Sequence, residues 1–171
     1  LAFGFESGML NDATGTTPTE RILVYDLGGG TFDVTVMELR GHEYATLAID
    51  GDVRLGGWDW DQRLVDLAAE RIIRQCGFDP REETRTWGKL WSLCEEAKRT
   101  LSVRTKALIP FEHQGQTVEI EVHRKEFEEA TLDLLDRTRF TTIQALKAAG
   151  LTWNDLTRVL LVGGATRMPM V

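Results

Sequence analysis

The sequence predicts an α/β fold in which a small α+β subdomain is inserted into a larger unit built on a sheet. This prediction depends on the order of the expected elements: three strands, two helices, two strands, a long helix and a final strand. The inserted subdomain is expected between about Gly56 and His123. With 171 residues, 42% of them apolar and 27% charged, the chain is long enough to bury a hydrophobic core.

The first three strands are expected to form an antiparallel meander. Apolar and alternating runs predict strands at 22–26, 34–39 and 44–50, after a polar loop at 11–19. A turn of three consecutive glycines at 28–30 joins the first two strands. The larger sheet is therefore expected to begin with neighbouring strands.

The inserted part is expected to contain two amphipathic helices and a hairpin. Apolar residues at helical spacing predict helices at 57–76, ended by Gly77, and at 81–102. Strands are predicted at 105–111 and 117–123, and the alternation in the second one indicates a sheet with one solvated face.

The last part of the chain is expected to return to the larger unit. The pattern predicts a long helix at 125–149, a short helix near 153–156 and a strand at 158–162. Gly150 would end the long helix.

The composition argues against several classes of protein. A net charge of −7 without a block of Lys or Arg argues against nucleic acid as a partner. No apolar run reaches the length of a membrane span and the N-terminus lacks the layout of a signal peptide, so we expect no membrane partner and a soluble, intracellular protein. The histidines lack the spacing of a transition-metal site, and Cys76 and Cys94 are expected to be reduced thiols in the core.

Residues 26–33, Asp-Leu-Gly-Gly-Gly-Thr-Phe-Asp, predict a hairpin suited to phosphate. Consecutive glycines let backbone N–H groups converge on an anion. Because carboxylates repel phosphate unless a cation lies between them, Asp26 and Asp33 imply Mg²⁺ held largely through water. A strand follows the glycines, which rejects the P-loop and the dinucleotide fingerprint. The glycines alone would fit a plain turn, and the paired aspartates with Thr31 favour phosphate.

A polar stripe lies on the second predicted helix. Glu95, Lys98, Arg99 and Ser102 are spaced at i, i+3, i+4 and i+7 and so share one face. One interpretation is a solvated surface. The other is a line of hydrogen-bonding groups with a guanidinium able to stack on a planar ring, which would suit adenosine.

The end of the chain repeats the combination of glycine and arginine. Gly163 and Gly164 directly follow the last predicted strand, and Arg167 comes three residues later. Two glycines after a strand let the backbone approach a neighbouring group or a ligand closely. The alternative interpretation is a simple turn from strand to helix.

Four motifs together resemble the nucleotide-binding domain of the 70-kilodalton heat-shock chaperone family, the DnaK type. The motifs are residues 26–33, Leu55 to Gly57 with Asp59 and Asp61, residues 95–102, and residues 161–169. They occur in the order of the family along nearly the whole chain. The resemblance implies an actin-like ATPase fold with a ribonuclease H-like motif, in which this chain is lobe II. Subdomain IIA would then comprise 1–55 and 124–171, and subdomain IIB would comprise 56–123.

The resemblance also implies the residues of a Mg-ATP or Mg-ADP site. The expected catalytic residues are Asp26, Asp33 and Thr31, and the two aspartates would order Mg²⁺ and its waters. The expected nucleotide-binding residues are Gly28, Gly29, Gly30, Gly57, Glu95, Lys98, Arg99, Ser102, Gly163, Gly164 and Arg167. Within this set Gly28 and Gly29 would donate to the phosphates with Thr31, and the stripe would bind ribose and base. Arg99 and Arg167 would enclose the adenine, with Gly163 and Gly164 at its edge.

Three residues depart from the pattern of the family. Trp58 stands where the family usually has glutamate, and Trp60 where it has phenylalanine. Ala165 replaces a serine that touches the base, which removes one hydroxyl and leaves the stacking arginines in place.

The function implied by the resemblance is that of a stress-response molecular chaperone in the cytoplasm, which couples ATP hydrolysis to protein folding. Its partners would be lobe I and a peptide-binding domain of the same protein, a J-domain co-chaperone, a nucleotide-exchange factor and unfolded clients. We expect the chain to be a fragment that does not hydrolyse ATP alone, because the first phosphate loop and the catalytic lysine of the family have no counterpart in it. Two alternatives stay open: a sugar or small-molecule kinase of the same superfold, against which the polar stripe argues, and a non-catalytic docking lobe.

Overall fold

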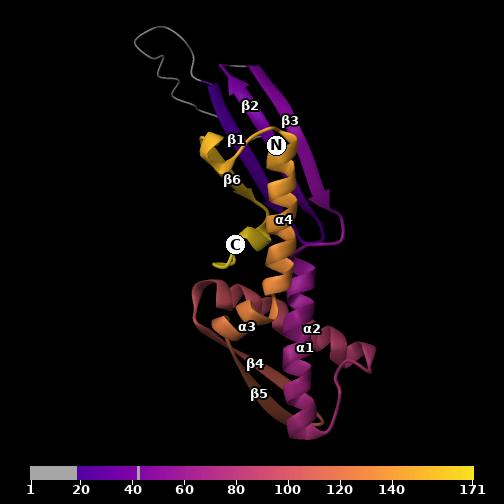
Figure 1. Cartoon of the computed structure of the whole chain (residues 1–171). Helices are drawn as coiled ribbons and strands as arrows, with labels where there is room; N and C mark the ends of the chain where they lie inside the picture. The colour runs from indigo at the N-terminus through magenta and orange to yellow at the C-terminus, as the bar shows by residue number, and fades with distance from the viewer. Residues whose placement is uncertain (1–18, 42) are drawn as a thin grey trace.

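The computed structural model describes residues 19–41 and 43–171 and shows an elongated molecule (Figure 1). A sheet covered by one helix forms one end, and two helices with a β-hairpin form the other. The elements in chain order are β1 (Thr19–Leu27), β2 (Phe32–Arg40), β3 (Glu43–Asp52), α1 (Gly57–Cys76), α2 (Thr84–Val103), β4 (Lys106–His113), β5 (Gln116–His123), α3 (Arg124–Ala130), α4 (Leu132–Ala148), η1 (Trp153–Asp155), β6 (Arg158–Val162) and η2 (Gly164–Arg167). None of the described helices combines the length and apolarity needed to cross a bilayer.

The larger sheet has the strand order β3-β2-β1-β6. The pairs β1–β2 and β2–β3 are antiparallel, which confirms the predicted meander, and β6 lies parallel to β1. The start of β6 is fixed by two reciprocal contacts, in which the amide of Arg21 donates to the Thr157 hydroxyl at 3.0 Å and the amide of Thr157 donates to the Arg21 carbonyl at 2.8 Å. The last strand therefore completes the sheet beside the first.

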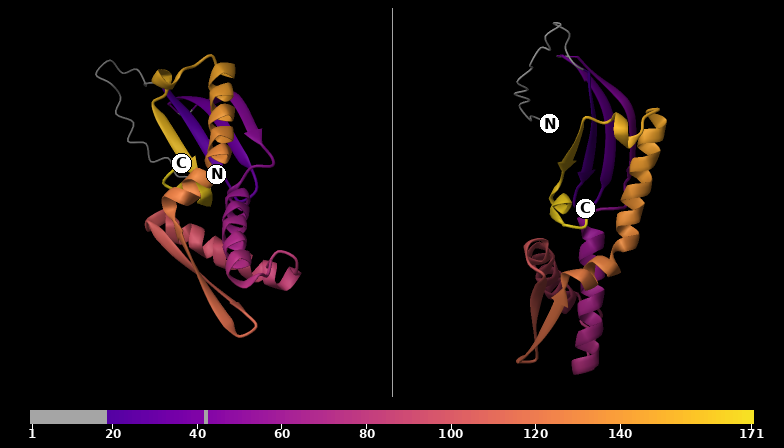
Figure 2. Two further views of the ribbon diagram at one scale, coloured as in Figure 1. Left: turned by 60° about the horizontal axis from the view of Figure 1, so that its bottom comes forward. Right: turned by 60° about the vertical axis from the view of Figure 1, so that its left-hand side comes forward.

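Helix α4 covers one face of this sheet, as the two views of Figure 2 show. On β2 the side chains of Phe32, Val34 and Val36 are buried while Asp33 between them is exposed, which is the alternation of a sheet with one covered face. Leu134 and Leu146 of α4 are buried in the same hydrophobic core. One face of β2 is thus used for packing, and Asp33 projects from the other face.

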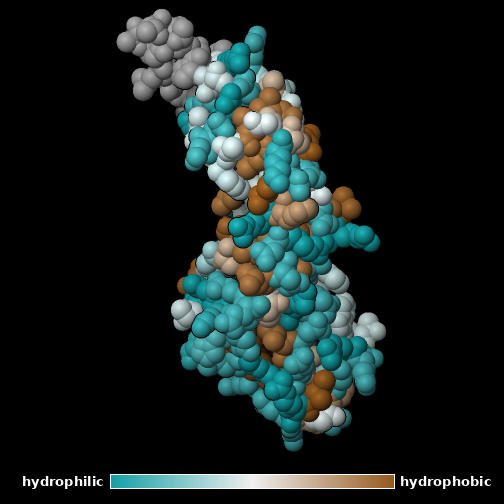
Figure 3. Space-filling model, viewed as in Figure 1, coloured by the Kyte–Doolittle hydropathy of each residue, from teal (hydrophilic) through white to brown (hydrophobic). Residues whose placement is uncertain are grey.

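The second part packs α1 and α2 against the β4–β5 hairpin. Ala107, Ile109 and Phe111 of β4 are buried and alternate with exposed residues, so the predicted sheet with one solvated face is confirmed. The hairpin turn has positive φ at both central residues, Gln114 (49°) and Gly115 (77°), as two-residue hairpin turns require. Figure 3 shows that the surface of this part is mostly hydrophilic on the side viewed.

The end of α1 agrees with the prediction. Gly77 adopts the left-handed conformation with φ of 66°, and its amide donates to the Ile73 carbonyl at 2.8 Å. The first three strands extend beyond their predicted ends by one to three residues, β4 is shifted (106–113 against 105–111), β5 begins one residue earlier than predicted, and β6 has the predicted bounds. Of the loop expected at 11–19, residues 11–18 lie outside the described residues and Thr19 already belongs to β1.

Three predictions about helices and cysteines were wrong. The long helix expected at 125–149 is interrupted at Thr131, whose hydroxyl donates to the Phe127 carbonyl at 2.8 Å and whose backbone leaves helical geometry (φ −119°, ψ 9°). Helix α2 begins at Thr84 rather than at 81, because Asp79 accepts a hydrogen bond from the Arg81 amide (2.9 Å) and holds a turn there. Cys76 is exposed at the end of α1.

Cys94 is a buried free thiol, as expected. Burial raises its pKa to about 12, and the nearby carboxylates Asp61 and Asp66 act in the same direction. A thiol with such a pKa stays protonated at neutral pH, so Cys94 acts as a small core residue.

Candidate functional site

The glycine turn between β1 and β2 is tied to the start of α1. The amides of Gly57 and Trp58 donate to the carbonyls of Gly28 and Gly29 at 2.9 and 2.8 Å. Two of the first N–H groups of α1, which have no partner inside the helix, are thereby satisfied by the turn. The turn and the helix form one rigid corner at the junction of the two parts.

The same corner leaves a row of backbone amides open. The Gly28 amide donates to the Thr31 carbonyl at 3.0 Å and closes the turn. Within the described residues, the amides of Gly29, Gly30 and Thr31 donate to no group of the chain. Such a run of unpaired amides is the arrangement that accepts an anion.

Close packing at the corner explains Gly56. A Cβ on Gly56 would lie 2.5 Å from the Gly30 nitrogen, so only glycine fits there without displacing the turn. The Gly56 amide donates to the Asp59 carboxylate at 2.8 Å, which fixes the first turn of α1. The absence of a side chain at Gly56 therefore allows the glycine turn and the start of α1 to lie in contact.

Asp26 and Asp33 are directly opposite each other on β1 and β2. Glycines on the neighbouring backbone leave space beside both carboxylates. A Cβ on Gly51 would lie 2.9 Å from Asp33 Oδ1, and a Cβ on Gly163 would lie 3.0 Å from Asp26 Oδ1 and 2.2 Å from the Leu27 carbonyl oxygen. Gly163 also has a φ of 91°, which favours glycine. The predicted pair of carboxylates is thus brought together at the end of the hairpin.

These two carboxylates do not form a complete protein cage for a metal. No group of three or more His, Cys, Asp or Glu side chains that could hold an ion occurs in the part of the chain that the structure describes. Mg²⁺ commonly keeps several waters and takes one or two carboxylates together with substrate phosphates. The pair therefore fits a cation whose other ligands are water and phosphate.

Lys98 and Asp61 form the floor of the site between α1 and α2. Lys98 Nζ donates to Asp61 Oδ2 at 2.7 Å and to the Gly57 carbonyl at 2.8 Å, and the two side chains are only 12% and 8% exposed. The other carboxylate oxygen of Asp61, Oδ1, is buried without a hydrogen-bond partner among the described residues. Burial raises the pKa of Asp61, although the hydrogen bond and the charge of Lys98 oppose this shift.

The rest of the polar stripe on α2 is more exposed. Arg99 forms an ion pair with Glu95 one turn earlier, and its side chain is 73% exposed. The Ser102 hydroxyl donates to the Lys98 carbonyl at 3.1 Å. The guanidinium of Arg99 is therefore held at one end and open on its faces.

The glycine corner, the α2 stripe and η2 surround one cleft of about 820 Å³. Its lining residues are Gly28, Gly29, Gly30, Gly57, Trp58, Asp61, Trp91, Glu95, Lys98, Arg99, Ser102, Val103, Gly164, Ala165, Arg167 and Met168. All four stripe residues are in this set, so the stripe faces a cleft rather than forming an ordinary solvated surface. Of the expected site residues, those outside the lining are Asp26, Thr31, Asp33 and Gly163, which belong to the adjoining strand ends and turns.

Sequence reasoning missed several lining residues. Trp91 could have been found by extending the stripe one helical turn back from Glu95, since i and i+4 share a face. Asp61 lies in a motif that was noted, but its pairing with Lys98 joins two helices and has no local signal. Ala165 and Met168 line the cleft because the start of α1 lies close to η2. A Cβ added to Gly57 would lie 3.3 Å from the Cβ of Ala165.

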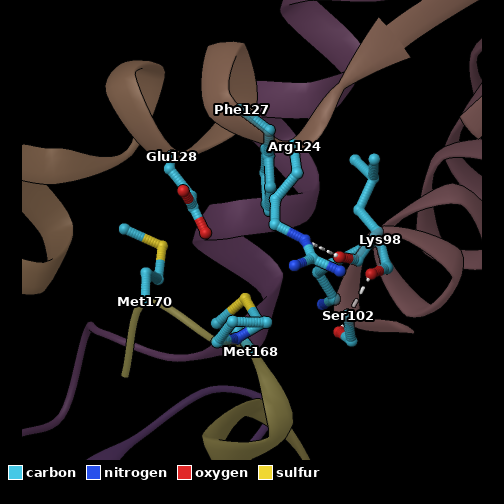
Figure 4. Close-up of a pocket in the computed structure, with 9 residues that line it drawn as sticks. Lys98, Ser102, Arg124, Phe127, Glu128, Met168 and Met170 are labelled. Carbon is cyan, nitrogen blue, oxygen red and sulfur yellow. Dashed lines mark hydrogen bonds between the residues drawn. The ribbon is translucent and has the colours of Figure 1, made fainter. Parts of the chain in front are cut away.

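A second, much smaller cavity lies behind the stripe (Figure 4). Its volume of about 10 Å³ is close to the minimum for one water. Arg124 beside it donates to the carbonyls of Leu101 (2.7 Å) and Arg104 (2.9 Å), which closes the C-terminal end of α2. This cavity is part of the packing between α2, α3 and the segment at Met168.

This chain is similar in sequence to several DnaK proteins. The Chaperone protein DnaK of Metamycoplasma hominis is 45% identical over 158 residues, which cover 89% of this chain and 27% of the relative. The Chaperone protein DnaK of Mesomycoplasma hyopneumoniae strain 7448 is 41% identical over 100% of this chain and 28% of its own length. That of Deinococcus proteolyticus is 42% identical over 89% of this chain and 25% of its own length. Each of these relatives is thus a DnaK protein that carries the name of a chaperone.

A family model described as Hsp70 protein matches residues 1–171, and the chain therefore belongs to the Hsp70 family. This confirms the resemblance to DnaK-type chaperones found in the sequence, and it does not favour the sugar-kinase or docking-lobe alternatives. The chain spans about a quarter of the length of these curated relatives, between 25% and 28%.

Proposed function

We propose that this chain is lobe II of the nucleotide-binding domain of an Hsp70-type chaperone and that its cleft binds Mg-ATP and Mg-ADP. The observation that carries the proposal is the meeting, in one cleft, of open glycine-turn amides with the polar stripe of α2 and Arg167. Amides attract phosphate at one end, and planar guanidinium groups suit an adenine ring at the other.

The phosphate end is assigned to the turn and the two aspartates. The amides of Gly29, Gly30 and Thr31 would hold the terminal phosphates. The Gly28 amide, which the resemblance also assigned to phosphate, instead donates to the Thr31 carbonyl within the turn. Asp26 and Asp33 would order Mg²⁺ through its waters, and the cation would supply charge stabilisation for phosphoryl transfer to water. The space that Gly51 and Gly163 leave beside the carboxylates supports this fit.

The nucleoside end is assigned to α2 and η2. Glu95 and Ser102 would bind the ribose and the base, and Lys98 would contribute its remaining donor while it holds Asp61. Arg99 and Arg167 would enclose the adenine, with Gly163 and Gly164 at its edge. Ala165 offers no hydroxyl to the base, so stacking would carry more of the recognition here.

The remaining features of the family are proposed for the longer protein to which this chain would belong. Lobe II would pair with a lobe I in an actin-like fold, with subdomain IIA at 1–55 and 124–171 and subdomain IIB at 56–123. ATP hydrolysis would control a peptide-binding domain acting on unfolded clients in the cytoplasm, with a J-domain co-chaperone and a nucleotide-exchange factor as partners. The coverage of only part of each DnaK relative supports this arrangement.

Calorimetric titration of the full-length protein with Mg-ADP tests the site through Arg99. A guanidinium stacked on a ring contributes about 1–2 kcal/mol, so Arg99→Ala is expected to weaken binding roughly tenfold. Arg99→Lys keeps the charge but loses the plane and is not expected to restore affinity. Arg85→Ala, an exposed arginine on the same helix outside the cleft, is the matched control. The assignment of Arg99 to the adenine would be contradicted if Arg99→Ala bound Mg-ADP as tightly as the unsubstituted protein. It would also be contradicted if Arg99→Lys bound Mg-ADP with full affinity.

A further inference from the structure

Three tryptophans form a continuous aromatic cluster at one side of the cleft. The ring centroids of Trp58 and Trp91 are 4.6 Å apart with 30° between the ring planes, and those of Trp91 and Trp87 are 5.3 Å apart with 44°. Trp58 and Trp91 line the cleft, whereas Trp87 is not among its lining residues. The cluster therefore presents two of its indoles to whatever occupies the cleft.

Trp58 remains 51% exposed although it is stacked. Its backbone amide donates to the Gly29 carbonyl at 2.8 Å, so the residue is fixed beside the phosphate turn. Its ring reaches across to Trp91 on α2. An indole supported on one side and open on the other is a preformed apolar surface that loses little conformational entropy when a ligand packs on it.

The position of Trp91 sets which part of a nucleotide this surface would meet. Trp91, Glu95 and Arg99 follow one another at intervals of four residues on the same face of α2, and all three line the cleft. Under the proposed function Arg99 contacts the base and Glu95 contacts the ribose. Trp91 lies one further turn away from the base, and Trp58 extends from it toward the phosphate turn.

We infer that Trp58, backed by Trp91, is a nucleotide-binding residue whose indole packs against the ribose of the bound nucleotide and slows its release. The inference rests on the proposed function and adds a contact of a different kind. A carboxylate accepts hydrogen bonds from sugar hydroxyls, and an aromatic face packs against the apolar C–H side of a sugar ring. Glu95 and Trp58, which both line the cleft, would supply these two chemistries.

Release of radiolabelled Mg-ADP from the full-length protein, chased with excess unlabelled ATP, tests the inference. Loss of an aromatic contact of ordinary strength predicts that Trp58→Ala accelerates release by roughly 3- to 10-fold. Trp58→Phe keeps an aromatic face and is expected to restore most of the slow release. Trp87→Ala, which removes an indole of the same cluster outside the cleft, is the matched control and is expected to release ADP at the parent rate.

A second readout separates contact with ligand from support of the fold. Mg-ADP binding is expected to change tryptophan emission in the parent and in Trp87→Phe, and this change is expected to shrink strongly in Trp58→Phe. Parent-like release from Trp58→Ala would overturn the inference while leaving the nucleotide site intact, provided that Mg-ADP still binds. If Trp58→Ala released Mg-ADP at the unchanged rate but hydrolysed ATP more slowly, the indole would be assigned to a contact between protein segments. That result would also overturn the inference. Absence of Mg-ADP binding to the parent would instead reject the proposed function itself.

Discussion

Replacing Lys98 by methionine removes the ammonium group that joins α1 to α2 under the cleft. Methionine keeps much of the length and apolar surface of the side chain, so the change is mainly the loss of two contacts. These are the 2.7 Å contact with Asp61 Oδ2 and the 2.8 Å contact with the Gly57 carbonyl. Because Asp61 Oδ1 already lacks a partner within the described chain, both carboxylate oxygens would then be buried without one.

The burial of both partners sets the size of the effect. With side chains only 12% and 8% exposed, removal of one partner is expected to cost about 3–5 kcal/mol of the free energy of unfolding. Arg99→Met is the matched control on the same helix, because it breaks an i,i+4 pair with Glu95 in which the arginine is 73% exposed. That pair is expected to contribute no more than about 0.5 kcal/mol.

Urea unfolding followed by circular dichroism measures both variants, and a second substitution checks the cause. Asp61→Leu combined with Lys98→Met removes the buried charge altogether, so it is expected to recover much of the stability lost in Lys98→Met. A loss below about 1 kcal/mol in Lys98→Met, or a double variant less stable than the single one, would refute the reasoning.

Acidification provides an independent check on the charge of Asp61. Burial raises the pKa of Asp61 in the folded protein, and loss of Lys98 is expected to raise it further. The Asp61 carboxylate then binds a proton more tightly in the folded state than in the unfolded state. The free-energy cost of burying its charge is therefore present at high pH and is relieved as pH falls through the pKa of the folded state. The stability gap between Lys98→Met and the parent should therefore narrow on acidification, and a gap independent of pH would point to lost packing instead.

Three further predictions concern the phosphate end of the cleft. Asp26→Asn and Asp33→Asn in the full-length protein are expected to lower ATP hydrolysis much more than nucleotide affinity, because both aspartates are proposed to act through the metal. Calorimetry and phosphate release measure the two quantities, and a loss of affinity with an unchanged rate would reject the Mg²⁺ assignment. Gly56→Ala is expected to cost about 1–3 kcal/mol of stability in urea unfolding, since its Cβ would lie 2.5 Å from the Gly30 nitrogen; a parent-like midpoint would show that the corner is loose. The chain alone is expected to give a cooperative thermal transition yet hydrolyse ATP no faster than buffer, and measurable turnover would contradict the need for a second lobe.

Most helices and strands were predictable because their apolar residues repeat with a clear period. The interruption at Thr131 was not, since Phe-Glu-Glu-Ala-Thr-Leu is compatible with a continuous helix and the hydroxyl-to-carbonyl contact within the segment has no periodic signature. Cys76 was misplaced for a similar reason, because its helix is amphipathic but its own position falls on the exposed side at the last residue.

The candidate site divides in the same way. The glycine turn and the α2 stripe were visible as local patterns, and the structure places them on one cleft. The sequence left open whether Arg99 faces solvent or a cleft. Residue spacing shows which side chains share one face of a helix, but it does not show what lies opposite that face. The ion pair of Asp61 with Lys98 joins residues 37 positions apart, and the tryptophan contact joins α1 to α2; both depend on how the helices cross.

The pairing of β6 with β1 has a consequence for biosynthesis. Arg21 and Thr157 are separated by 136 residues, which a ribosome adds in roughly 7 to 27 seconds at ordinary elongation rates. During that interval the nascent β1 can pair with β2 but has no β6 on its other edge, and an uncovered edge invites pairing with other chains. Gly163, which packs against Leu27, emerges still later. If the proposed function holds, a protein that acts on unfolded chains would itself pass through a stage in which an exposed strand edge needs protection.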